Sequence, residues 1–370
     1  MLRFRRGMLP SPEVLQYTGG DNDRGGVISV VRNLASTGHF RCVLGVNPGC
    51  VQHREPALEV LELPRIAGEE ISPLTFWRAR VVALVVQTWL QAGSNRVYHG
   101  HSRAGLLVGL WLHWLGERRA VVSVHCYGRH RWFYRWAADR LGSRLYWLSP
   151  AMKKYYSAGD PNWTHCMPEC VPPVVSAGLS RTRVSDLIRL GGIGALVRWK
   201  NWQLVLDALA LLPAEIRQRF RFRHIGTDDG SADSLALATE LRTRSETAGL
   251  RGIVEWHGQQ ASPEFFLSET DCLVVASNNE PFSVAMLEAL RAGVPVLAAD
   301  SGGAQDIVRP GSNGWLFRTG DAAGLARQLE LLVNSDALDS LRVGQTDLRQ
   351  FDATIVAERW AKIYFDLGAV

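Results

Sequence analysis

Short apolar runs alternate with longer amphipathic segments along the whole chain of 370 residues. Runs of about four to eight residues rich in Val, Ile and Leu are typical of buried strands, and helical segments between them indicate successive βα units. We predict strands at residues 41–47, 96–101, 120–126, 145–150, 187–193, 220–226, 253–258, 271–277 and 295–300. Because parallel strands need such crossover segments, the pattern predicts an α/β protein with doubly wound, Rossmann-like parallel sheets.

The chain is long enough for two such sheets, since a single hydrophobic core rarely extends beyond about 250 residues. A polar, proline-rich segment at residues 167–186 separates the two groups of strands and is the expected hinge. We therefore predict an N-terminal domain over residues 1–172 and a C-terminal domain over residues 173–350. A C-terminal helix over residues 351–370 is expected to pack back on the N-terminal domain.

Charge is divided unevenly between the two halves. Residues 1–170 hold 21 Lys and Arg against 12 Asp and Glu, a net of +9, and the rest of the chain balances this to +5 overall. Arginines are interleaved with aromatic residues in "TFWRARVV" (residues 75–82) and "GRHRWFYRWAADRLG" (residues 128–142). Such a surface attracts phosphates or anionic lipid headgroups. The alternative is a solvated helix face whose tryptophans belong to the core.

Several features bear on the compartment. No segment reaches the roughly 20 apolar residues of a membrane span, and the basic start "MLRFRRGMLPSPE" lacks the apolar stretch of a signal peptide. Six cysteines are scattered along the chain, which suits free thiols in a reducing compartment. We expect a cytoplasmic protein, with peripheral attachment to the inner face of a membrane as a further option.

Two glutamates lie close to a predicted strand-to-helix connection near residue 280, one in its loop and one in the helix that follows. The strand should end at Ser277 and the next helix should begin near Ser283, so the loop lies at the carboxyl edge of a parallel sheet. The exposed N–H groups of the helix start are a natural seat for a diphosphate. Glu280 in the loop and Glu288 in the helix could each accept hydrogen bonds from sugar hydroxyls. The pattern predicts a nucleotide-sugar site, although Glu288 could also be a partly exposed helix residue.

The string "EPFSVAMLE" (residues 280–288), followed by "GVPV" and "SGG", resembles the signature of the retaining group 1 glycosyltransferases, glycosyltransferase family 4. Their GT-B fold has two Rossmann-like domains that face a central cleft. The resemblance implies that Glu288 binds the ribose of the donor. It also implies that Glu280 and the backbone N–H groups of Phe282 and Ser283 hold the transferred sugar and its diphosphate. Asp306 stands where the family generally has glutamate.

A second part of the donor site is implied by "GALVRWKN" (residues 194–201). Lys200 fits the family's phosphate-binding lysine, whose charge stabilises the departing diphosphate. Ala195 stands where the family has an arginine, so either Arg198 or another basic residue supplies that charge or the stabilisation of the diphosphate is weaker. Gly226, at the end of a predicted strand, is counted with the donor-binding residues. Lys200 could otherwise be a surface lysine before a helix.

The N-terminal half carries three weaker matches. "GGDNDRGGVISVVRNLA" (residues 19–35) resembles the glycine-rich loop that approaches the donor phosphates and the acceptor, and places Gly25 and Gly26 there, although a plain turn explains these glycines as well. "VYHGHSRAG" places His101 at the domain cleft, and "VVSVHCYG" places His125 beside the transferred sugar. A histidine there could orient a sugar hydroxyl or the acceptor. A purely structural role is the alternative for both.

The resemblance implies an enzyme that transfers a hexosyl unit from a nucleotide-sugar to a glycan or lipid-linked acceptor, in cell-surface polysaccharide or glycolipid biosynthesis. In its retaining mechanism the leaving diphosphate oxygen helps to deprotonate the acceptor, so neither a metal nor another cofactor is expected. "DND" (residues 21–23) is interpreted as a solvated turn and "HCMPEC" (residues 165–170) as a weak zinc pattern.

Other functional classes stay open or are less favoured. Ala195 keeps open a noncatalytic nucleotide-sugar-binding protein or a partner subunit of the same fold. A GT-B epimerase or phosphorylase would need its own catalytic acid or a pyridoxal lysine, and neither is evident. "GGIGAL" (residues 191–196) lacks the last glycine of a dinucleotide fingerprint, which argues against a dehydrogenase. No nucleic acid partner is expected.

Overall fold

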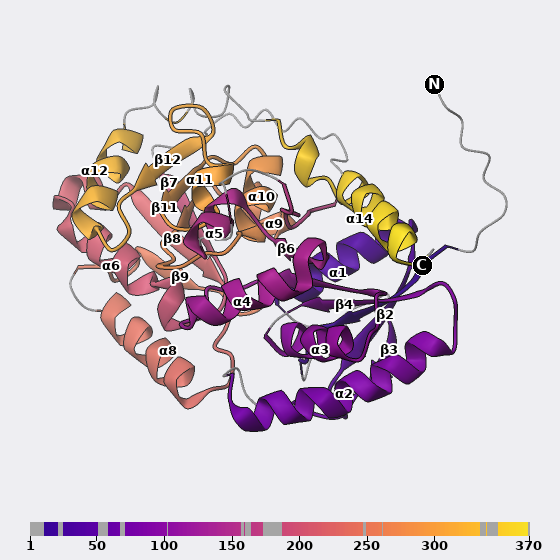
Figure 1. The fold of residues 1–370 in the computed structure, drawn as a ribbon. Coiled ribbons are helices and arrows are strands. Elements are labelled where there is room, and N and C mark those ends of the chain that lie inside the picture. The colour runs from indigo at the N-terminus through magenta and orange to yellow at the C-terminus, as the bar shows by residue number, and fades with distance from the viewer. Residues whose placement is uncertain are drawn as a thin grey trace, which may run out of the picture. The chain divides into compact units, whose positions relative to one another are not determined.

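The computed structural model describes residues 11–20, 25–50, 58–66, 71–101, 103–156, 159, 164–172, 187–246, 249–260, 262–333, 338 and 347–368. Contacts divide the chain into two compact units, which are coloured by residue number in Figure 1. The N-terminal unit comprises residues 1–173 and 350–370, and the C-terminal unit comprises residues 174–349. The motif "DND" and residues 173–186 of the predicted hinge lie outside the described residues.

The N-terminal unit contains a parallel sheet with strand order β3-β2-β1-β4-β5-β6. Its strands are β1 (Glu13–Tyr17), β2 (Arg41–Val46), β3 (Glu59–Glu62), β4 (Arg96–His101), β5 (Ala120–Val124) and β6 (Leu145–Trp147). This is the order of Rossmann-type sheets, in which ligands bind outside the carboxyl ends of the strands, at the point where the strand order reverses. Here that point lies between β1 and β4.

Helices cover both faces of this sheet. They are α1 (Gly26–Ser36), α2 (Pro73–Gln91), α3 (Arg103–Trp114), α4 (Arg131–Leu141), α5 (Pro150–Tyr155) and α14 (Ala353–Gly368). Helices α2 and α3 pack against each other and against β4, and Figure 1 shows them side by side. Helix α14 contacts α1 and β4, so the last helix of the chain is part of the N-terminal unit.

Helix α2 has a well-defined start. Ser72 is its N-cap and accepts a hydrogen bond from the backbone N–H of Thr75, whose hydroxyl accepts one from the N–H of Ser72. This reciprocal capping box, with Pro73 in the first turn, satisfies N–H groups that would otherwise lack partners. The helix buries Ala79, Val82 and other small apolar residues against the unit.

The C-terminal unit repeats the same architecture, with strand order β12-β11-β10-β7-β8-β9 and only parallel pairs. Its strands are β7 (Ile188–Ile193), β8 (Phe220–Ile225), β9 (Val254–Trp256), β10 (Cys272–Val275), β11 (Val296–Ala299) and β12 (Gly314–Phe317). Its helices are α6 (Trp202–Leu211), α7 (Ala214–Arg217), α8 (Ala232–Ser245), α9 (Glu264–Ser268), α10 (Val284–Arg291), α11 (Ala304–Ile307) and α12 (Ala322–Val333). The strand order reverses between β7 and β10.

All nine predicted strands are present, with ends within three residues of the predicted bounds. Three strands were not predicted: β1, β3 and β12. The run "EVLQY" of β1 mixes Glu and Gln with apolar residues, yet Gln16 is fully buried because its amide hydrogen-bonds inside the unit. Among the described residues, no helix combines the length and the apolar character needed to cross a bilayer.

Candidate active site

A loop at the carboxyl end of β10 leads into α10 and carries the first of the two predicted glutamates. Ser283 is the N-cap of α10, and its hydroxyl accepts a hydrogen bond from the backbone N–H of Met286. Phe282 before it is buried, and Glu288 lies half-buried on α10. The first turn of α10 holds no acidic residue, so the positive end of the helix dipole is not neutralised by its own side chains.

Glu280 is almost fully buried and is held by two donors. Its Oε2 atom accepts hydrogen bonds from Nζ of Lys200 at 2.6 Å and from Oγ of Ser277 at 2.8 Å. Only 5% of the Glu280 side chain and 15% of the Lys200 side chain are exposed. Nζ of Lys200 also lies 4.4 Å from the centre of the Trp199 ring, a cation–π contact. The two predicted charged residues are therefore brought together in one buried ion pair.

This pair lies where the strand order of the C-terminal sheet reverses. Lys200 follows β7 and Glu280 follows β10, and these two strands are direct neighbours. The backbone N–H of Asn278 donates to the carbonyl of Trp199 at 2.8 Å, which ties the two loops together. The position is the one at which open parallel sheets bind their ligands.

Close contacts explain why two positions of the site, Gly194 and Gly226, are occupied by glycine. A Cβ atom on Gly226 would lie 2.0 Å from the carbonyl oxygen of Gly194, and both residues have positive φ angles, of 128° and 148°. A Cβ on Gly194 would in turn approach Cε of Lys200 to 3.3 Å. The loops after β7 and β8 therefore approach each other closely enough to exclude any side chain at Gly226.

The "SGG" turn contacts the glutamate loop in the same way. The N–H of Gly303 donates to the backbone carbonyl of Glu280 at 3.1 Å. A Cβ on Gly303 would lie 2.6 Å from the carbonyl oxygen of Pro281. Gly303, the last residue of the "SGG" turn, thus fixes the position of the Glu280 backbone.

Arg198, considered as the substitute for the family's arginine, is engaged elsewhere. Its Nε atom lies 2.8 Å from Oδ1 of Asp233, and Nη1 lies 3.9 Å from Oε2 of Glu240, both on α8. More than half of its side chain is exposed. Ala195 itself is half-buried, and its carbonyl accepts a hydrogen bond from Nε1 of Trp202.

In the N-terminal unit, Gly25 and Gly26 lie at the start of α1. Gly25 is the N-cap, with a φ angle of 103° that favours glycine, and no side chain of the described residues is seen to cap the helix. A Cβ atom on either residue would meet nothing within 4 Å. Among the described residues, no atom therefore occupies the space beside these two glycines, and their role in binding a phosphate stays a prediction.

The two predicted histidines contact each other, but neither presents a ring nitrogen without a hydrogen-bond partner. Nδ1 of His101 lies 2.9 Å from Nε2 of His125, and Nε2 of His101 lies 2.6 Å from Oε1 of Gln16. Nδ1 of His125 lies 3.1 Å from Oε1 of Glu169. His101, expected at the domain cleft, is 2% exposed, and burial lowers its pKa well below the usual value. Orienting a sugar hydroxyl through His125 would require exchanging one of these bonds.

The hydrogen-bonded chain continues beyond Gln16. Its Nε2 atom lies 3.3 Å from the hydroxyl of Tyr364 on α14, which lies 2.6 Å from Nδ1 of His99. Nε2 of His99 lies 2.8 Å from Oγ of Ser123. Sequence reasoning singled out two members of this chain and missed the others. Glu169 lies in the segment "HCMPEC", which the sequence offered only as a weak zinc pattern.

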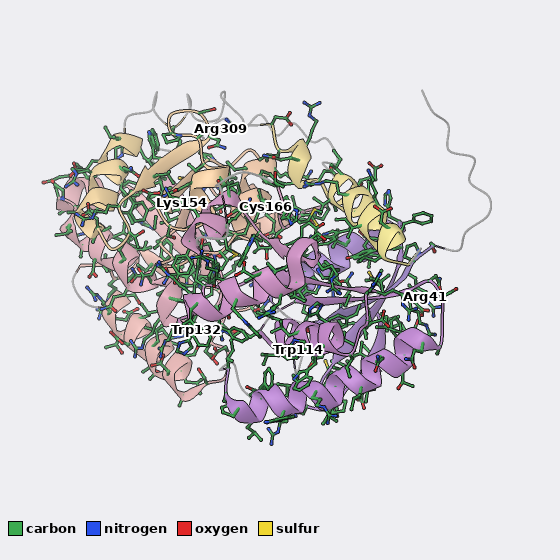
Figure 2. All side chains as sticks on the ribbon, viewed as in Figure 1. Arg41, Trp114, Trp132, Lys154, Cys166 and Arg309 are labelled. Carbon is green, nitrogen blue, oxygen red and sulfur yellow. The ribbon has the colours of Figure 1, made fainter. Side chains whose placement is uncertain are left out.

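Apolar and basic residues share the outer surface of the N-terminal unit. The side of α2 that faces solvent carries both kinds of residue: Arg78 and Arg80 are exposed, and so are the apolar residues Leu74, Trp77, Val81, Leu84 and Val85. Trp114 and Trp132, labelled in Figure 2, are 44% and 70% exposed. The alternative in which the tryptophans belong to the core therefore does not hold for these residues.

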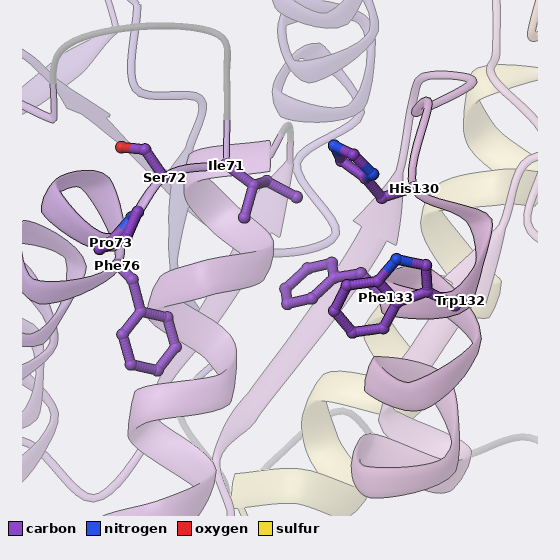
Figure 3. Close-up of a pocket in the computed structure, with 7 residues that line it drawn as sticks. All are labelled: Ile71, Ser72, Pro73, Phe76, His130, Trp132 and Phe133. Carbon is purple, nitrogen blue, oxygen red and sulfur yellow. The ribbon is translucent and has the colours of Figure 1, made fainter.

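A shallow apolar pocket of about 320 Å³ opens beside the start of α2. It is lined by Ile71, Ser72, Pro73, Phe76, His130, Trp132 and Phe133. Figure 3 shows these side chains at the starts of α2 and α4, with Ile71 and Ser72 just before α2 and His130 just before α4. Apolar walls next to a basic helix are suited to a hydrocarbon or a sugar face and not to a charged group.

Residues 185–344 match the model of the family described as glycosyl transferases group 1. The lipopolysaccharide core biosynthesis glycosyltransferase LpsE of Rhizobium meliloti (strain 1021) is 29% identical over 175 residues, which cover 46% of this chain and 48% of LpsE. The match therefore spans about half of the length of that relative. The lipopolysaccharide core biosynthesis mannosyltransferase LpcC of Rhizobium leguminosarum bv. viciae is 24% identical over 282 residues, 75% of this chain and 78% of LpcC.

Solved structures resemble the whole chain. The crystal structure of Anabaena Alr3699/HepE in complex with UDP-glucose has a TM-score of 0.74 at 18% identity and covers 95% of this chain and 99% of that chain. A likeness at this level of identity concerns the fold. Together with the two six-stranded parallel sheets, it confirms the predicted GT-B class.

Proposed function

We propose that the protein transfers a hexosyl unit from a nucleotide-sugar to a glycan or lipid-linked acceptor, because residues 185–344 match the model of the group 1 glycosyl transferases and the chain has the GT-B fold. The observation that carries this proposal is the buried pair of Lys200 and Glu280. It lies beside the N-terminus of α10, at the carboxyl edge of the sheet, where a lysine and helix N–H groups can bind a diphosphate.

The donor is assigned to the C-terminal unit. Glu288 on α10 accepts hydrogen bonds from the ribose, and the helix start at Phe282 and Ser283 faces the diphosphate. Gly226 is assigned to the same site, where the close approach of its backbone to Gly194 leaves no room for a side chain. UDP-glucose is the molecule named in the Alr3699/HepE structure. By analogy we propose a nucleoside diphosphate sugar as donor here.

In the transfer step, negative charge develops on the diphosphate as the glycosidic bond breaks. Lys200 stabilises that charge, and its contact with Glu280 fixes the ammonium group before the donor binds. Glu280 holds the transferred sugar through hydroxyl groups. We propose retention of configuration, with the leaving oxygen taking the proton of the acceptor on the same face of the sugar. Positive charge then comes from the protein, so no metal is required by this scheme.

The acceptor is assigned to the N-terminal unit, near Gly25 and Gly26. The outer face of α2, where apolar residues are exposed together with Arg78 and Arg80, favours attachment to an anionic membrane surface, where a lipid-linked acceptor would be available. The relatives LpsE and LpcC are named for lipopolysaccharide core biosynthesis. A role in cell-surface polysaccharide or glycolipid assembly at the cytoplasmic side of a membrane is the corresponding proposal for this chain.

A donor screen by mass spectrometry tests the function. UDP-, GDP- and ADP-sugars are incubated with the protein, with and without a lipid extract that supplies acceptors. We expect one donor to be consumed by the wild type and not by Glu288→Ala, while Glu330→Ala, an exposed glutamate on α12, behaves like the wild type. Adding EDTA should leave the rate unchanged.

The second candidate, a noncatalytic nucleotide-sugar-binding protein or partner subunit, is favoured by one observation. Ala195 removes a cation from the donor site, and Arg198 is paired with Asp233 on α8 instead. If a donor binds and Glu288→Ala abolishes binding, but no acceptor extract ever leads to its consumption, this candidate replaces the transferase.

A further inference from the structure

Trp199 lies directly before Lys200, in the loop that follows β7, and its ring contacts the side chain of that lysine. Nζ of Lys200 lies 4.4 Å from the centre of the Trp199 ring. Trp199 is nevertheless 42% exposed, whereas Trp202 is 2% exposed and belongs to the core of the C-terminal unit. Core packing therefore accounts for Trp202 and does not account for a tryptophan at position 199.

The shape of the loop produces the contact between these two neighbouring residues. Adjacent side chains of a regular helix or strand point in different directions and do not face each other. Here the loop forms a single turn of 3-10 helix, Arg198–Lys200, in which the N–H of Lys200 donates to the carbonyl of Val197 at 3.0 Å. Asn201 then has a left-handed conformation, with a φ angle of 53°, which asparagine tolerates better than most residues.

The backbone of Trp199 is also fixed from the loop that carries Glu280. Its carbonyl accepts a hydrogen bond from the N–H of Asn278 at 2.8 Å. The side chain of Asn278 takes part as well, since its Oδ1 atom lies 3.1 Å from Nδ2 of Asn201. Two hydrogen bonds to one residue tie the turn to the neighbouring loop, so the Trp199 backbone and the Glu280 loop are held in a fixed relation.

Lys200 is thereby held on two sides. Oε2 of Glu280 lies 2.6 Å from Nζ, and the face of the Trp199 ring carries the partial negative charge that attracts a cation. Lysine has a compact charge on a flexible four-carbon stem, so a single partner leaves its orientation poorly defined. The ring restricts the ammonium group without neutralising its charge, which a second carboxylate would do.

We propose that Trp199 is a positioning residue that acts through Lys200, by holding its ammonium group where charge develops on the leaving diphosphate. The catalytic consequence rests on the proposed function, whereas the ring contact does not. Accurate placement matters more in this chain because Ala195 supplies no cation and Arg198 is paired with Asp233 on α8. Electrostatic stabilisation of a transition state depends on charges that are already in position.

The positioning can be observed without any substrate. The chain has four lysines, so ¹H–¹³C correlation spectra of lysine-labelled protein contain few Hε signals, and Lys200→Arg assigns those of Lys200. Protons near the face of an aromatic ring are shifted upfield by its ring current. We therefore expect the Hε signals of Lys200 upfield of those of the other lysines, with its two Hε protons inequivalent because the group is fixed.

Trp199→Leu, which keeps an apolar side chain but lacks the ring, should return these signals to the usual position and merge them. Phe265→Leu is the control, because Phe265 is an exposed aromatic residue on α9 of the same unit, and it should leave the signals unchanged. Signals that stay inequivalent in Trp199→Leu would mean that Glu280 alone fixes Lys200, and would overturn the proposal.

Kinetics test the role in transfer. With the donor that the screen identifies, Trp199→Leu should lower kcat about tenfold and change KM for the donor less than about twofold, because charge on the diphosphate develops mainly in the transition state. Trp199→Phe keeps an aromatic face and should retain about half of the rate or more. Equal loss in the Leu and Phe variants would mean that the ring face is not what matters.

A double variant separates action through Lys200 from a direct contact with substrate or support of the whole loop. Lys200→Met has no ammonium group to position, so adding Trp199→Leu should lower its kcat by less than about a further twofold. If Trp199 contacted the sugar itself or held the loop as a whole, the two losses would multiply. That result would refute a role through Lys200.

The wild-type spectrum decides the contact even if a variant does not fold. Hε signals of Lys200 at the usual position in the wild type would overturn the proposal, whether or not the protein transfers a sugar. If no donor is consumed, the proposed function fails, while the spectra of wild type and Trp199→Leu still decide whether the ring fixes the lysine. The two proposals therefore fail separately.

Discussion

Nζ of Lys200 lies 2.6 Å from Oε2 of Glu280, although the two residues are 80 positions apart in the chain and both side chains are largely removed from solvent. A lysine whose charge is balanced by a buried carboxylate is held rigidly before any ligand arrives. When a diphosphate binds, the ammonium group needs little reorganisation to share its hydrogens with it.

Lys200→Met should separate the catalytic from the structural role of this pair. The change removes the charge but keeps most of the side-chain volume, and we expect kcat to fall about 100-fold or more. Stability should fall by about 3 kcal/mol because Glu280 is left buried without its partner. Steady-state kinetics and urea unfolding measure the two effects.

The double variant Lys200→Met with Glu280→Gln sharpens that test. Removing the second charge should restore much of the stability and none of the activity. Arg251→Met is the control, since Arg251 pairs with Glu246 on the exposed surface of the same unit and such pairs contribute little. A kcat of Lys200→Met within twofold of the wild type would refute the assigned role.

Ala195→Arg should strengthen nucleotide binding. The position is half-buried in the loop after β7, beside Gly194, and a guanidinium there can form charge-assisted hydrogen bonds with a phosphate. We expect Kd for the nucleoside diphosphate to fall about tenfold by isothermal titration, equivalent to about 1.4 kcal/mol. Ala195→Gln has a similar length without the charge, so equal affinities in the two variants would contradict the prediction.

Gly226→Ala should destabilise the C-terminal unit through a direct collision. The new Cβ would lie 2.0 Å from the carbonyl of Gly194, so the loops after β7 and β8 must separate. Gly230→Ala is the matched control, because Gly230 also has a positive φ, of 83°, but open space around it. The control should lose about 1 kcal/mol of unfolding free energy and Gly226→Ala about 3 kcal/mol or more. Equal losses of unfolding free energy in the two variants would mean that the cost comes from the positive φ angle and not from the collision with Gly194.

Strands and helices of this chain could be predicted because their residues follow local rules. The strand that ends before the glutamate loop is a continuous apolar run, and the "SGG" turn has a glycine where backbone atoms touch. β1 could not be found in this way, because its buried Gln16 is explained only by partners 85 and 348 positions away.

In the candidate site, too, some residues could be predicted from local sequence and others depend on distant partners. Its signature residues were identifiable from a contiguous string of sequence. The partner of His125 was not, since Glu169 reaches it only through the tertiary fold, 44 positions further along the chain. Arg198 shows the converse: a suitable residue at a suitable distance in sequence is paired with α8 by the geometry of its own loop.

Exposed tryptophans predict membrane attachment. Trp77 and Trp132 are 59% and 70% exposed, and exchanging both for Ser removes apolar area that could enter the lipid interface. In vesicle sedimentation we expect the bound fraction on anionic vesicles to fall at least about fivefold. Phe265→Ser, which changes an aromatic residue 74% exposed on α9 of the C-terminal unit, should bind like the wild type. Equal binding of wild type to neutral and anionic vesicles, or to neither, would refute the basic surface as the attachment site.

Acid should destabilise the protein partly through His224. The ring is fully buried between Trp202 and Trp256, and burial lowers its pKa to about 3. The unfolded chain takes up a proton near pH 6.5 while the folded protein does not, so the contribution to stability is complete above pH 6.5 and is lost as the pH falls toward about 3. Between pH 7.5 and 5.5 the loss amounts to about 1.4 kcal/mol.

His224→Phe should remove that part of the pH dependence, because phenylalanine takes up no proton in either state. Urea unfolding at pH 7.5 and 5.5 should show a decrease in unfolding free energy that is smaller by about 1.4 kcal/mol in the variant than in the wild type. His257→Gln, at a half-exposed ring that pairs with Glu255, is the control and should not reproduce this flattening. An unchanged pH dependence in His224→Phe would show that this ring is already protonated in the folded protein.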